Sequence, residues 1–507
     1  MKRKHTKLIC LGLALCLLTG LALGCNSSTN KTETATSEDA AQTTDQTTET
    51  TAAAAPDGTP PEGMGQPPER PDGTPSGGMP GGPGGMGQPP AGGPGGGPGG
   101  SSADIEYKGA VEITSADSQS GQTYASDTAD ESALLISTGD AVTVDDPTVT
   151  KSGSSDGGDS CNFYGLNAAV LIKDGADVTI TGGTITSDAM GANGVFCYGG
   201  NGGRNGAAGD GTTLTIRDTV ITTTGGGSGG IMTTGGGVTY AYDLTVTTSG
   251  QSSAPIRTDR GGGTVYVDGG TYTSNGLGSP TIYSTAEIHV SNATLTSNLS
   301  EGVCIEGKNS IELTNCDMTA NNTKMNSNAS FLDTIMIYQS MSGDADSGTS
   351  AFTMTGGSLT SKSGHVFHVT NTSAVINLND VTILNEDAQN ILLSVCADGW
   401  SGASNVATLN ASKQALAGTI LVGSDSTLTL NLIDGSALIG TISGSITNAK
   451  GEVVSTEVGT VDVTLDSTST WVLTGDTYIT SFTGEAANIV SNGYTLYVNG
   501  VALTGTK

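Results

Sequence analysis

Three stretches of this 507-residue chain follow one pattern: residues 265–272 read VYVDGGTY, residues 288–295 read IHVSNATL, and residues 311–318 read IELTNCDM. In each stretch two apolar residues flank a variable one, four residues follow, and a third apolar residue closes the unit. The three stretches are spaced 23 residues apart. A fixed period of this length is typical of a solenoid. The pattern recurs at Val178/Ile180/Ile185, Leu214/Ile216/Ile221, Val265/Val267/Tyr272, Ile288/Val290/Leu295, Ile311/Leu313/Met318, Phe352/Met354/Leu359 and Ile376/Leu378/Ile383.

The pattern predicts a strand, a bend and a second strand in every coil. Alternation places the flanking apolar residues on the inner side, and pairs such as Gly-Gly or Asn-Ala suit the bend. Neither strand buries enough apolar surface alone, whereas coils stacked about 4.8 Å apart share one interior. We therefore expect an all-β fold, a right-handed parallel β-helix with about 23 residues per coil over residues 105–440. Residues 441–507 are expected to continue the β structure and cap the open end.

Composition and charge exclude other classes of protein. The chain has 49 Asp and Glu against 19 Lys and Arg, which gives a formal charge of −30 at pH 7. Because nucleic-acid binding needs clustered cations, we expect no nucleic-acid partner. Aromatic residues make up 4% of the chain while glycine occupies 77 positions, a composition that disfavours long amphipathic helices.

The N-terminal 25 residues resemble an export signal. Four basic residues within the first seven positions precede an apolar run over residues 8–23. The run ends in LALGC at residues 21–25, which resembles a lipobox, so Cys25 is predicted to be acylated. The alternative is an uncleaved membrane anchor. Either reading predicts a protein at the extracellular face of the cell membrane that touches the bilayer only through its anchor.

Residues 26–104 have the composition of a disordered tether. The first part is rich in Thr, Ser, Ala and acidic residues, and residues 56–100 contain 13 of the 16 prolines together with 18 glycines. Such a segment cannot bury enough apolar surface to offset the entropy of ordering it. We expect it to hold the β-helix away from the membrane.

The solenoid resembles a known family. Residues 253–260 read SAPIRTDR, residues 301–308 read EGVCIEGK, and residues 338–344 read YQSMSGD. With the repeats around them, these motifs are similar to the pectate-lyase-like right-handed β-helices, and more closely to adhesin-like surface lipoproteins of Gram-positive bacteria. Many members of that fold bind or cleave polysaccharides, so the resemblance implies a polysaccharide or cell-surface glycan as partner.

A candidate binding surface follows from aligning the strand that precedes each repeat. The alignment places Phe196, Ile231, Ile256, Ile282, Ile305 and Ile337 inward, and it predicts an outward column of Cys197, Met232, Arg257, Tyr283, Glu306 and Tyr338. Asp259, Arg260, Glu301 and Lys308 would lie at its edge. Tyrosines that stack on sugar faces, with arginines and carboxylates that bind hydroxyls, would form a glycan platform. The alternative is a solvated sheet face with a structural ladder of ion pairs.

Catalysis is the second hypothesis for the same surface. A glycosidase needs two carboxyl groups about 5 to 9.5 Å apart, and Glu301 and Glu306 are the candidate pair. Five residues apart on an unbroken strand, they would face opposite sides. A lyase would instead need a cluster of metal-binding aspartates on neighbouring coils, and the sequence shows no such column.

The other polar motifs favour structure over metal binding. Asp344 and Asp346 could supply oxygens to calcium, the one ion that the sequence leaves open, although Asp and Gly runs are ordinary turn chemistry. His365 and His368 are three residues apart on a strand and are expected to face opposite ways. An odd number of cysteines fits no disulfide framework and predicts small packing residues, at Cys161, Cys197, Cys304, Cys316 and Cys396.

Together these features predict a lipid-anchored β-helix that binds a glycan or a neighbouring surface without turnover. The first alternative is a polysaccharide lyase or glycoside hydrolase acting on the same face. The second alternative is a structural rod that associates with itself. No cofactor is expected beyond the calcium considered above.

Overall fold

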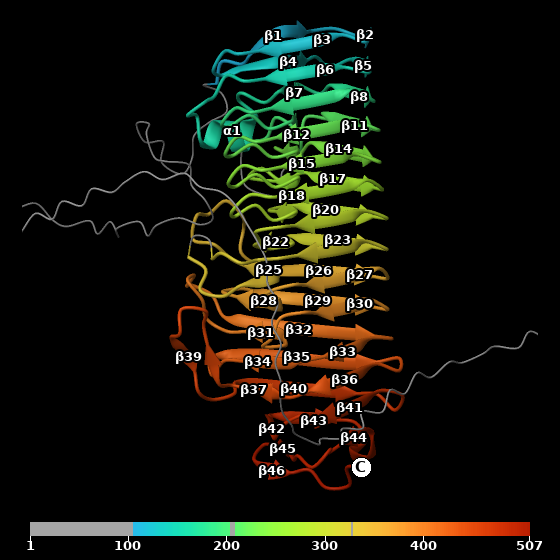
Figure 1. The fold of residues 1–507 in the computed structure, drawn as a ribbon, viewed down its shortest axis with the longest axis vertical. Coiled ribbons are helices and arrows are strands. Elements are labelled where there is room, and N and C mark those ends of the chain that lie inside the picture. The colour runs from blue at the N-terminus through green and yellow to red at the C-terminus, as the bar shows by residue number, and fades with distance from the viewer. Residues whose placement is uncertain (1–104, 203–207, 326–327) are drawn as a thin grey trace, which may run out of the picture. The chain divides into compact units, whose positions relative to one another are not determined.

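A computed structural model describes residues 105–202, 208–325 and 328–507. The predicted signal, Cys25 and the tether lie outside the described residues. The described chain winds as a right-handed parallel β-helix, in which each coil adds one strand to each of three long sheets (Figure 1). Successive sheet B strands begin at Thr264, Glu287 and Ser310, which gives the predicted 23 residues per coil, and insertions lengthen other coils.

Sheet A has thirteen strands in register, each pairing with the coil before and after. They are β1 (Lys108–Ile113), β4 (Glu131–Ser137), β7 (Val170–Lys173), β10 (Val195–Tyr198), β13 (Ile231–Thr234), β16 (Ile256–Thr258), β19 (Ile282–Ser284), β22 (Val303–Glu306), β25 (Asp333–Tyr338), β28 (His365–Thr370), β31 (Ile391–Val395), β34 (Thr419–Val422) and β37 (Ile442–Ser443).

Sheets B and C carry the two strands of the sequence pattern. The fourteen strands of sheet B are β2 (Asp117–Ser120), β5 (Ala141–Asp145), β8 (Asp177–Thr181), β11 (Thr213–Arg217), β14 (Val238–Tyr242), β17 (Thr264–Asp268), β20 (Glu287–Ser291), β23 (Ser310–Thr314), β26 (Thr349–Thr355), β29 (Ser373–Asn379), β32 (Asn405–Ser412), β35 (Ser426–Ile433), β40 (Thr460–Leu465) and β43 (Ser481–Thr483). The ten strands of sheet C are β3 (Thr123–Ser126), β6 (Thr148–Lys151), β9 (Thr184–Ser187), β12 (Val220–Thr223), β15 (Thr245–Thr248), β18 (Thr271–Ser274), β21 (Thr294–Ser297), β24 (Asp317–Ala320), β27 (Ser358–Ser361) and β30 (Thr382–Asn385).

The bend between sheets B and C is made by one or two residues in the left-handed backbone region. Asp243, Asn292 and Asn315 adopt φ of 51°, 55° and 52°, and Gly182 and Gly269 take the same place in other coils. Asn, Asp and Gly tolerate this conformation at low cost, which explains why these residue types follow the first strand of each repeat.

The interior is one continuous apolar stack. The patterned residues, among them Val265, Val267 and Tyr272, belong to a single buried cluster that runs from Ile113 to Leu496. Each coil alone has no closed core, so neighbouring coils supply the burial that holds it in place. The five body cysteines are buried as free thiols.

The C-terminal coils change their strand pattern. Sheet D consists of β33 (Ala415–Ala417), β36 (Ala437–Gly440), β41 (Thr470–Leu473) and β44 (Ile489–Val490), with Trp471 buried against it. An antiparallel pair joins β38 (Ile446–Thr447) and β39 (Val453–Ser455). A last small sheet contains β42 (Thr477–Ile479), β45 (Leu496–Val498) and β46 (Val501–Ala502), beside the 3-10 turn η2 (Ala486–Asn488).

The longest helix in the described part is α1 (Asp159–Tyr164), which lies in an insertion between β6 and β7. Among these residues, no helix combines the length and apolar character needed to cross a bilayer.

Candidate binding cleft on sheet A

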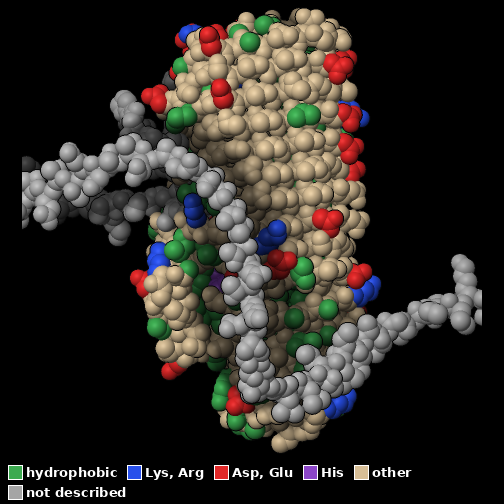
Figure 2. Space-filling view, in the orientation of Figure 1, with side chains coloured by type: hydrophobic (Ala, Val, Ile, Leu, Met, Phe, Trp, Pro, Cys, Tyr) green, Lys and Arg blue, Asp and Glu red, His purple; other side chains and the backbone are tan. Residues whose placement is uncertain are grey.

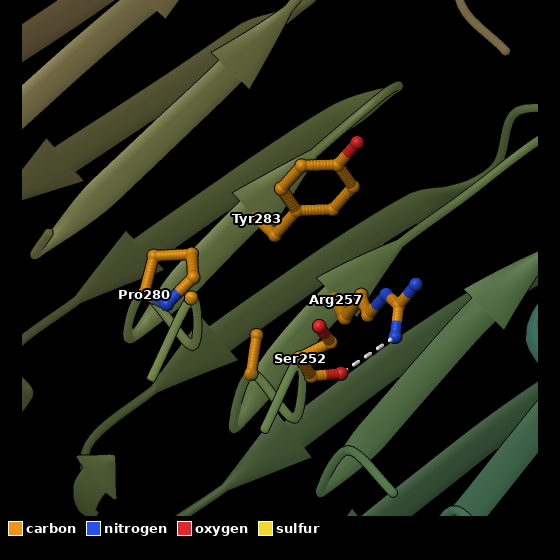
Figure 3. Close-up of a pocket in the computed structure, with 6 residues that line it drawn as sticks. Ser252, Arg257, Pro280 and Tyr283 are labelled. Carbon is orange, nitrogen blue, oxygen red and sulfur yellow. Dashed lines mark hydrogen bonds between the residues drawn. The ribbon is translucent and has the colours of Figure 1, made fainter. Parts of the chain in front are cut away.

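Insertions cover the outer face of sheet A on two sides of a small opening. On the N-terminal side, Phe163 and Tyr164 of α1 pack on Phe196, Tyr198 and Met232. On the C-terminal side, Ala329 and Trp400 close over Cys304, Met336 and Tyr338. Between them, Arg257 of β16 and Tyr283 of β19 lie side by side (Figure 3). The hollow beside them has a volume of about 40 Å³ and is lined by Ser252, Ala254, Arg257, Gly278, Pro280 and Tyr283.

Arg257 is held in place from three directions. Its guanidinium donates to the Asp259 carboxylate at 2.6 Å, to the Ser252 carbonyl at 3.2 Å and to the Asn162 side-chain oxygen at 3.4 Å. It also lies over the Tyr283 ring, 5.6 Å from the ring centre. Because its planar group is fixed before any ligand arrives, little entropy is lost when one binds.

Glu306 organises the floor of the cleft. Its buried carboxylate accepts hydrogen bonds from the Tyr283 hydroxyl at 2.6 Å, from the Tyr338 hydroxyl at 2.9 Å, and from Ser340. Tyr338 is fully buried and packs on Trp400, with ring centres 4.9 Å apart. Glu306 therefore fixes the orientation of Tyr283, while Tyr338 offers no ring face to solvent.

Two ion pairs form the edge of the cleft on the side of the turn that follows β25. Arg260 pairs with Asp344, and its guanidinium lies 4.2 Å from the centre of the Phe163 ring. Lys308 pairs with Asp346 at 3.0 Å, and both side chains are more exposed than those of the floor. The cationic groups of the cleft are thus each matched by a carboxylate.

Burial shifts the acid groups of the cleft toward their neutral forms. Burial raises the pKa of Asp259 to about 7, although the neighbouring Arg257 opposes the shift. Burial also raises the pKa of Glu306, and the hydroxyls of Ser340 and Tyr283 oppose it. The Tyr283 hydroxyl has a pKa well above its ordinary value, through burial and through the charge of Glu306. Tyr283 is therefore a hydrogen-bond donor at neutral pH.

The structure brings the seven predicted ligand-binding residues to one region but corrects their register. Arg257 and Tyr283 are neighbours on adjacent strands, as the alignment predicted. The residue after Tyr283 in that column is Cys304, because β19 and β22 pair two residues earlier than the alignment assumed. The alignment was also wrong at β10, where Phe196 faces outward and Cys197 packs in the interior. Glu306 reaches Tyr283 from the adjacent column through its long side chain.

The expectation that Glu301 and Glu306 face opposite sides is wrong. Two successive residues face inward at the start of these strands: Val366 and Phe367 in β28, and Gly302 with Val303 at β22, where a Cβ on Gly302 would meet Met318. The residue before such a pair, the residue after it and the residue two positions further on therefore share the outer face, as Glu301, Cys304 and Glu306 do. Both His365 and His368 therefore face outward, and their Nδ1 atoms each lie 2.7 Å from Ser394 Oγ.

Glu301 and Glu306 nonetheless do not form a matched pair. Glu301 accepts a hydrogen bond from Ser300, whereas Glu306 binds the tyrosines of the floor. Held by different partners, the two carboxyl groups are not arranged to face each other across one glycosidic bond. The arrangement fits a structural role for Glu306 better than proton transfer to a sugar.

The proposed calcium ligands Asp344 and Asp346 are each engaged by a cation. Asp344 pairs with Arg260 and Asp346 with Lys308, so their carboxylates point to different partners. Across residues 105–202, 208–325 and 328–507, no three side chains of His, Cys, Asp or Glu are placed to share a metal ion.

The outer face of sheet B carries an aromatic ladder that the sequence reasoning missed. Tyr240, Tyr266 and His289 stack on successive coils, with ring centres 5.2 Å and 5.0 Å apart and nearly parallel planes. A hollow of about 420 Å³ lies beside them, next to Asp268 and Asn292. The signal was present in the sequence, because these residues occupy the variable position between the two apolar residues of each repeat. In this stack Tyr266 has both ring faces covered, by Tyr240 and by His289.

Comparison of this chain with protein-family models, with curated proteins and with solved structures finds no match.

Proposed function

We propose that the protein binds a glycan in the cleft on sheet A, without turnover, as an adhesin-like lipoprotein of the cell surface anchored through Cys25. The observation that carries this proposal is the contact between Arg257 and Tyr283. The two side chains are partly exposed and lie between two regions of sheet A that insertions cover. A guanidinium beside an aromatic ring offers both hydrogen bonds to hydroxyls and an apolar surface for sugar C–H groups. The likeness to pectate-lyase-like β-helices supports the same partner.

The charges of the cleft favour a neutral glycan over an acidic one. Arg257 and Arg260 are already paired with Asp259 and Asp344, and the Glu306 carboxylate is bound to the neighbouring Tyr283. A uronic acid would have to compete with these carboxylates for each guanidinium, on a protein of formal charge −30. Hydroxyl groups accept the unused N–H donors of Arg257 without this repulsion.

A glycan array tests the proposal. The intact protein should bind a subset of neutral oligosaccharides, and the double variant Arg257→Ala with Tyr283→Ala should lose at least about tenfold in affinity, since each removed contact contributes about 1 kcal/mol. Tyr266→Ala, on the exposed ladder of sheet B, is the matched control and should bind as the wild type does. Circular dichroism of each variant checks that the coils remain stacked.

Two outcomes would count against the proposal. Equal binding by the wild type and the double variant would remove the cleft as the binding site. Release of oligosaccharides from a polysaccharide, abolished by Glu306→Gln, would replace binding with catalysis at the same face.

A further inference from the structure

Two carboxyl groups lie side by side under the segment that covers sheet A. Val303 pairs with Ile335 on the next coil, so Glu301 and Asp333, each two residues before this pair, are lateral neighbours. Neighbouring strands are about 4.8 Å apart. The residues are 3% and 1% exposed. The pair thus combines like charges with nearly complete burial.

The described surroundings supply no cationic side chain to this pair. Ser300 donates to Glu301, but no Lys or Arg among the described residues forms an ion pair with either carboxyl group. His365 follows Asp333 in the same column, but its Nδ1 atom lies 2.7 Å from Ser394 Oγ and the ring forms no ion pair with either carboxyl group. Two buried carboxylates without compensation would be strongly destabilising.

Two buried oxygens at the same place have no hydrogen-bond partner. They are Oδ1 of Asp333 and Oδ1 of Asn322, whose residues are each 1% exposed. The Asn322 nitrogen donates to the Asp333 carbonyl at 3.1 Å, and the same side chain contacts the Glu301 carboxyl group. The amide nitrogen therefore faces the carboxyl pair, and a half-turn of the side-chain amide places the unpartnered oxygen there instead.

The donor atoms at this place are those of a hard cation. Two carboxyl groups and an amide oxygen supply oxygen ligands, and the set contains no thiolate or imidazole. Oxygen-only sets of this kind suit Ca²⁺, whereas thiolate or imidazole sites select softer metals. Water would complete the coordination.

We propose that Glu301, Asp333 and Asn322 bind one hard divalent cation, with Ca²⁺ as the ion of best fit, between two coils of sheet A. Asn322 lies in the connection from β24 to β25, in which Ala329 and Phe331 pack over the sheet. A cation here neutralises the carboxyl pair and ties this covering segment to β22 and β25. The proposal stands apart from glycan binding, because none of the three residues lines the hollow at Arg257.

Calcium titration of protein dialysed against a chelator tests the site. Calorimetry should find one Ca²⁺ bound per chain, and millimolar Ca²⁺ should raise the melting temperature by several degrees. Glu301→Gln and Asp333→Asn keep the side-chain shape but remove the charge. Each should abolish the calcium-dependent shift and raise the melting temperature of the metal-free protein. Asp344→Asn and Asp346→Asn are the controls, and both should keep the shift.

The pair could instead be satisfied by one shared proton, and infrared spectroscopy separates the two states. The metal-free protein should show a protonated carboxyl band at neutral pH that is lost in Asp333→Asn and disappears on addition of Ca²⁺. Persistence at saturating Ca²⁺ of the part of the band that depends on Asp333 would overturn the site. So would a melting temperature that does not respond to Ca²⁺, or that responds equally in Glu301→Gln and Asp333→Asn.

Discussion

The outer faces of sheets A and C come from the same coils but carry different side chains. Of the twenty outward positions on the ten strands of sheet C, fifteen are threonine and one, Asp317, is charged. That uniformity leaves no group there to select a particular ligand. The outer face of sheet A instead holds Arg257, Glu301, Glu306, Asp333 and His368, most of them beneath insertions. Figure 2 shows one face of the molecule, and over much of its tan surface the charged side chains are few and separate.

The difference shows where the fold allows chemistry. Threonine is a stiff, β-branched residue that pairs well with threonine on the next strand, so sheet C is a scaffold that repeats itself. The turns that enter and leave the strands of sheet A contain the insertions. These insertions bury polar side chains that would face water on an uncovered sheet. Polar groups in a partly closed site interact more strongly than those on an open face.

The largest expected loss of stability comes from a substitution in the apolar interior, which lies behind both sheets. Phe367→Ala, in the core of β28, should lower the free energy of unfolding by about 3–5 kcal/mol, since it removes a fully buried ring and leaves a cavity. Guanidinium denaturation followed by circular dichroism measures it. A loss no larger than that of a surface variant would mean that the coils are not packed on this ring.

The next effect separates buried from exposed carboxylates. Glu306→Ala should lower the free energy of unfolding by about 2–3 kcal/mol, because it leaves the hydroxyls of Tyr283 and Tyr338 without an acceptor. Glu312→Ala on sheet B is the control, since its side chain is 50% exposed, and should change stability by less than about 0.5 kcal/mol. Equal effects would show that sheet A is as open to water as sheet B.

Acid should destabilise the covered part of sheet A through His365. Burial lowers the pKa of this histidine to about 3, below the ordinary value of 6.5, so the unfolded chain binds a proton before the folded one. The stabilisation is complete above pH 6.5 and falls as pH decreases toward 3, by about 1.4 kcal/mol per pH unit within this window. Unfolding of the wild type and of His365→Asn across this range measures the effect. The variant should have the flatter profile, and identical profiles would contradict the burial of His365.

The smallest effect is expected on sheet C. Thr247→Ala replaces an outward threonine of β15 and should change the free energy of unfolding by less than about 0.5 kcal/mol, with glycan binding unchanged. A large loss of binding in this variant would move the site from sheet A to the threonine face.

The regular parts of this molecule were predictable from the sequence because they follow a local rule. The spacing of Val265, Val267 and Tyr272 specifies two strands and a bend, and stacking leaves few other ways to bury them. The neighbourhood of Arg257 and Tyr283 followed from the same register. The step from Tyr283 to Cys304 could not be predicted, because the turn from β21 to β22 is shorter than the turn from β18 to β19 and shifts the pairing by two residues.

The part of sheet A that insertions cover could not be predicted from the repeat pattern. Its contacts join distant segments, such as Trp400 over Tyr338 and Asn322 beside Asp333, and no repeat marks them. Glu301 lies beside Asp333 because β22 and β25 are adjacent strands. The sequence alone does not show this adjacency. Strict alternation failed at His365 and His368 because the strand turns two successive residues inward.

A crystal structure of the protein soaked with its best-binding neutral oligosaccharide tests the account most directly. The account predicts sugar density in the cleft on sheet A, with hydroxyl groups at the Arg257 guanidinium and a sugar ring beside Tyr283. Density in the hollow beside Tyr240 and Tyr266, or on the threonine face of sheet C, with the cleft empty, would contradict it.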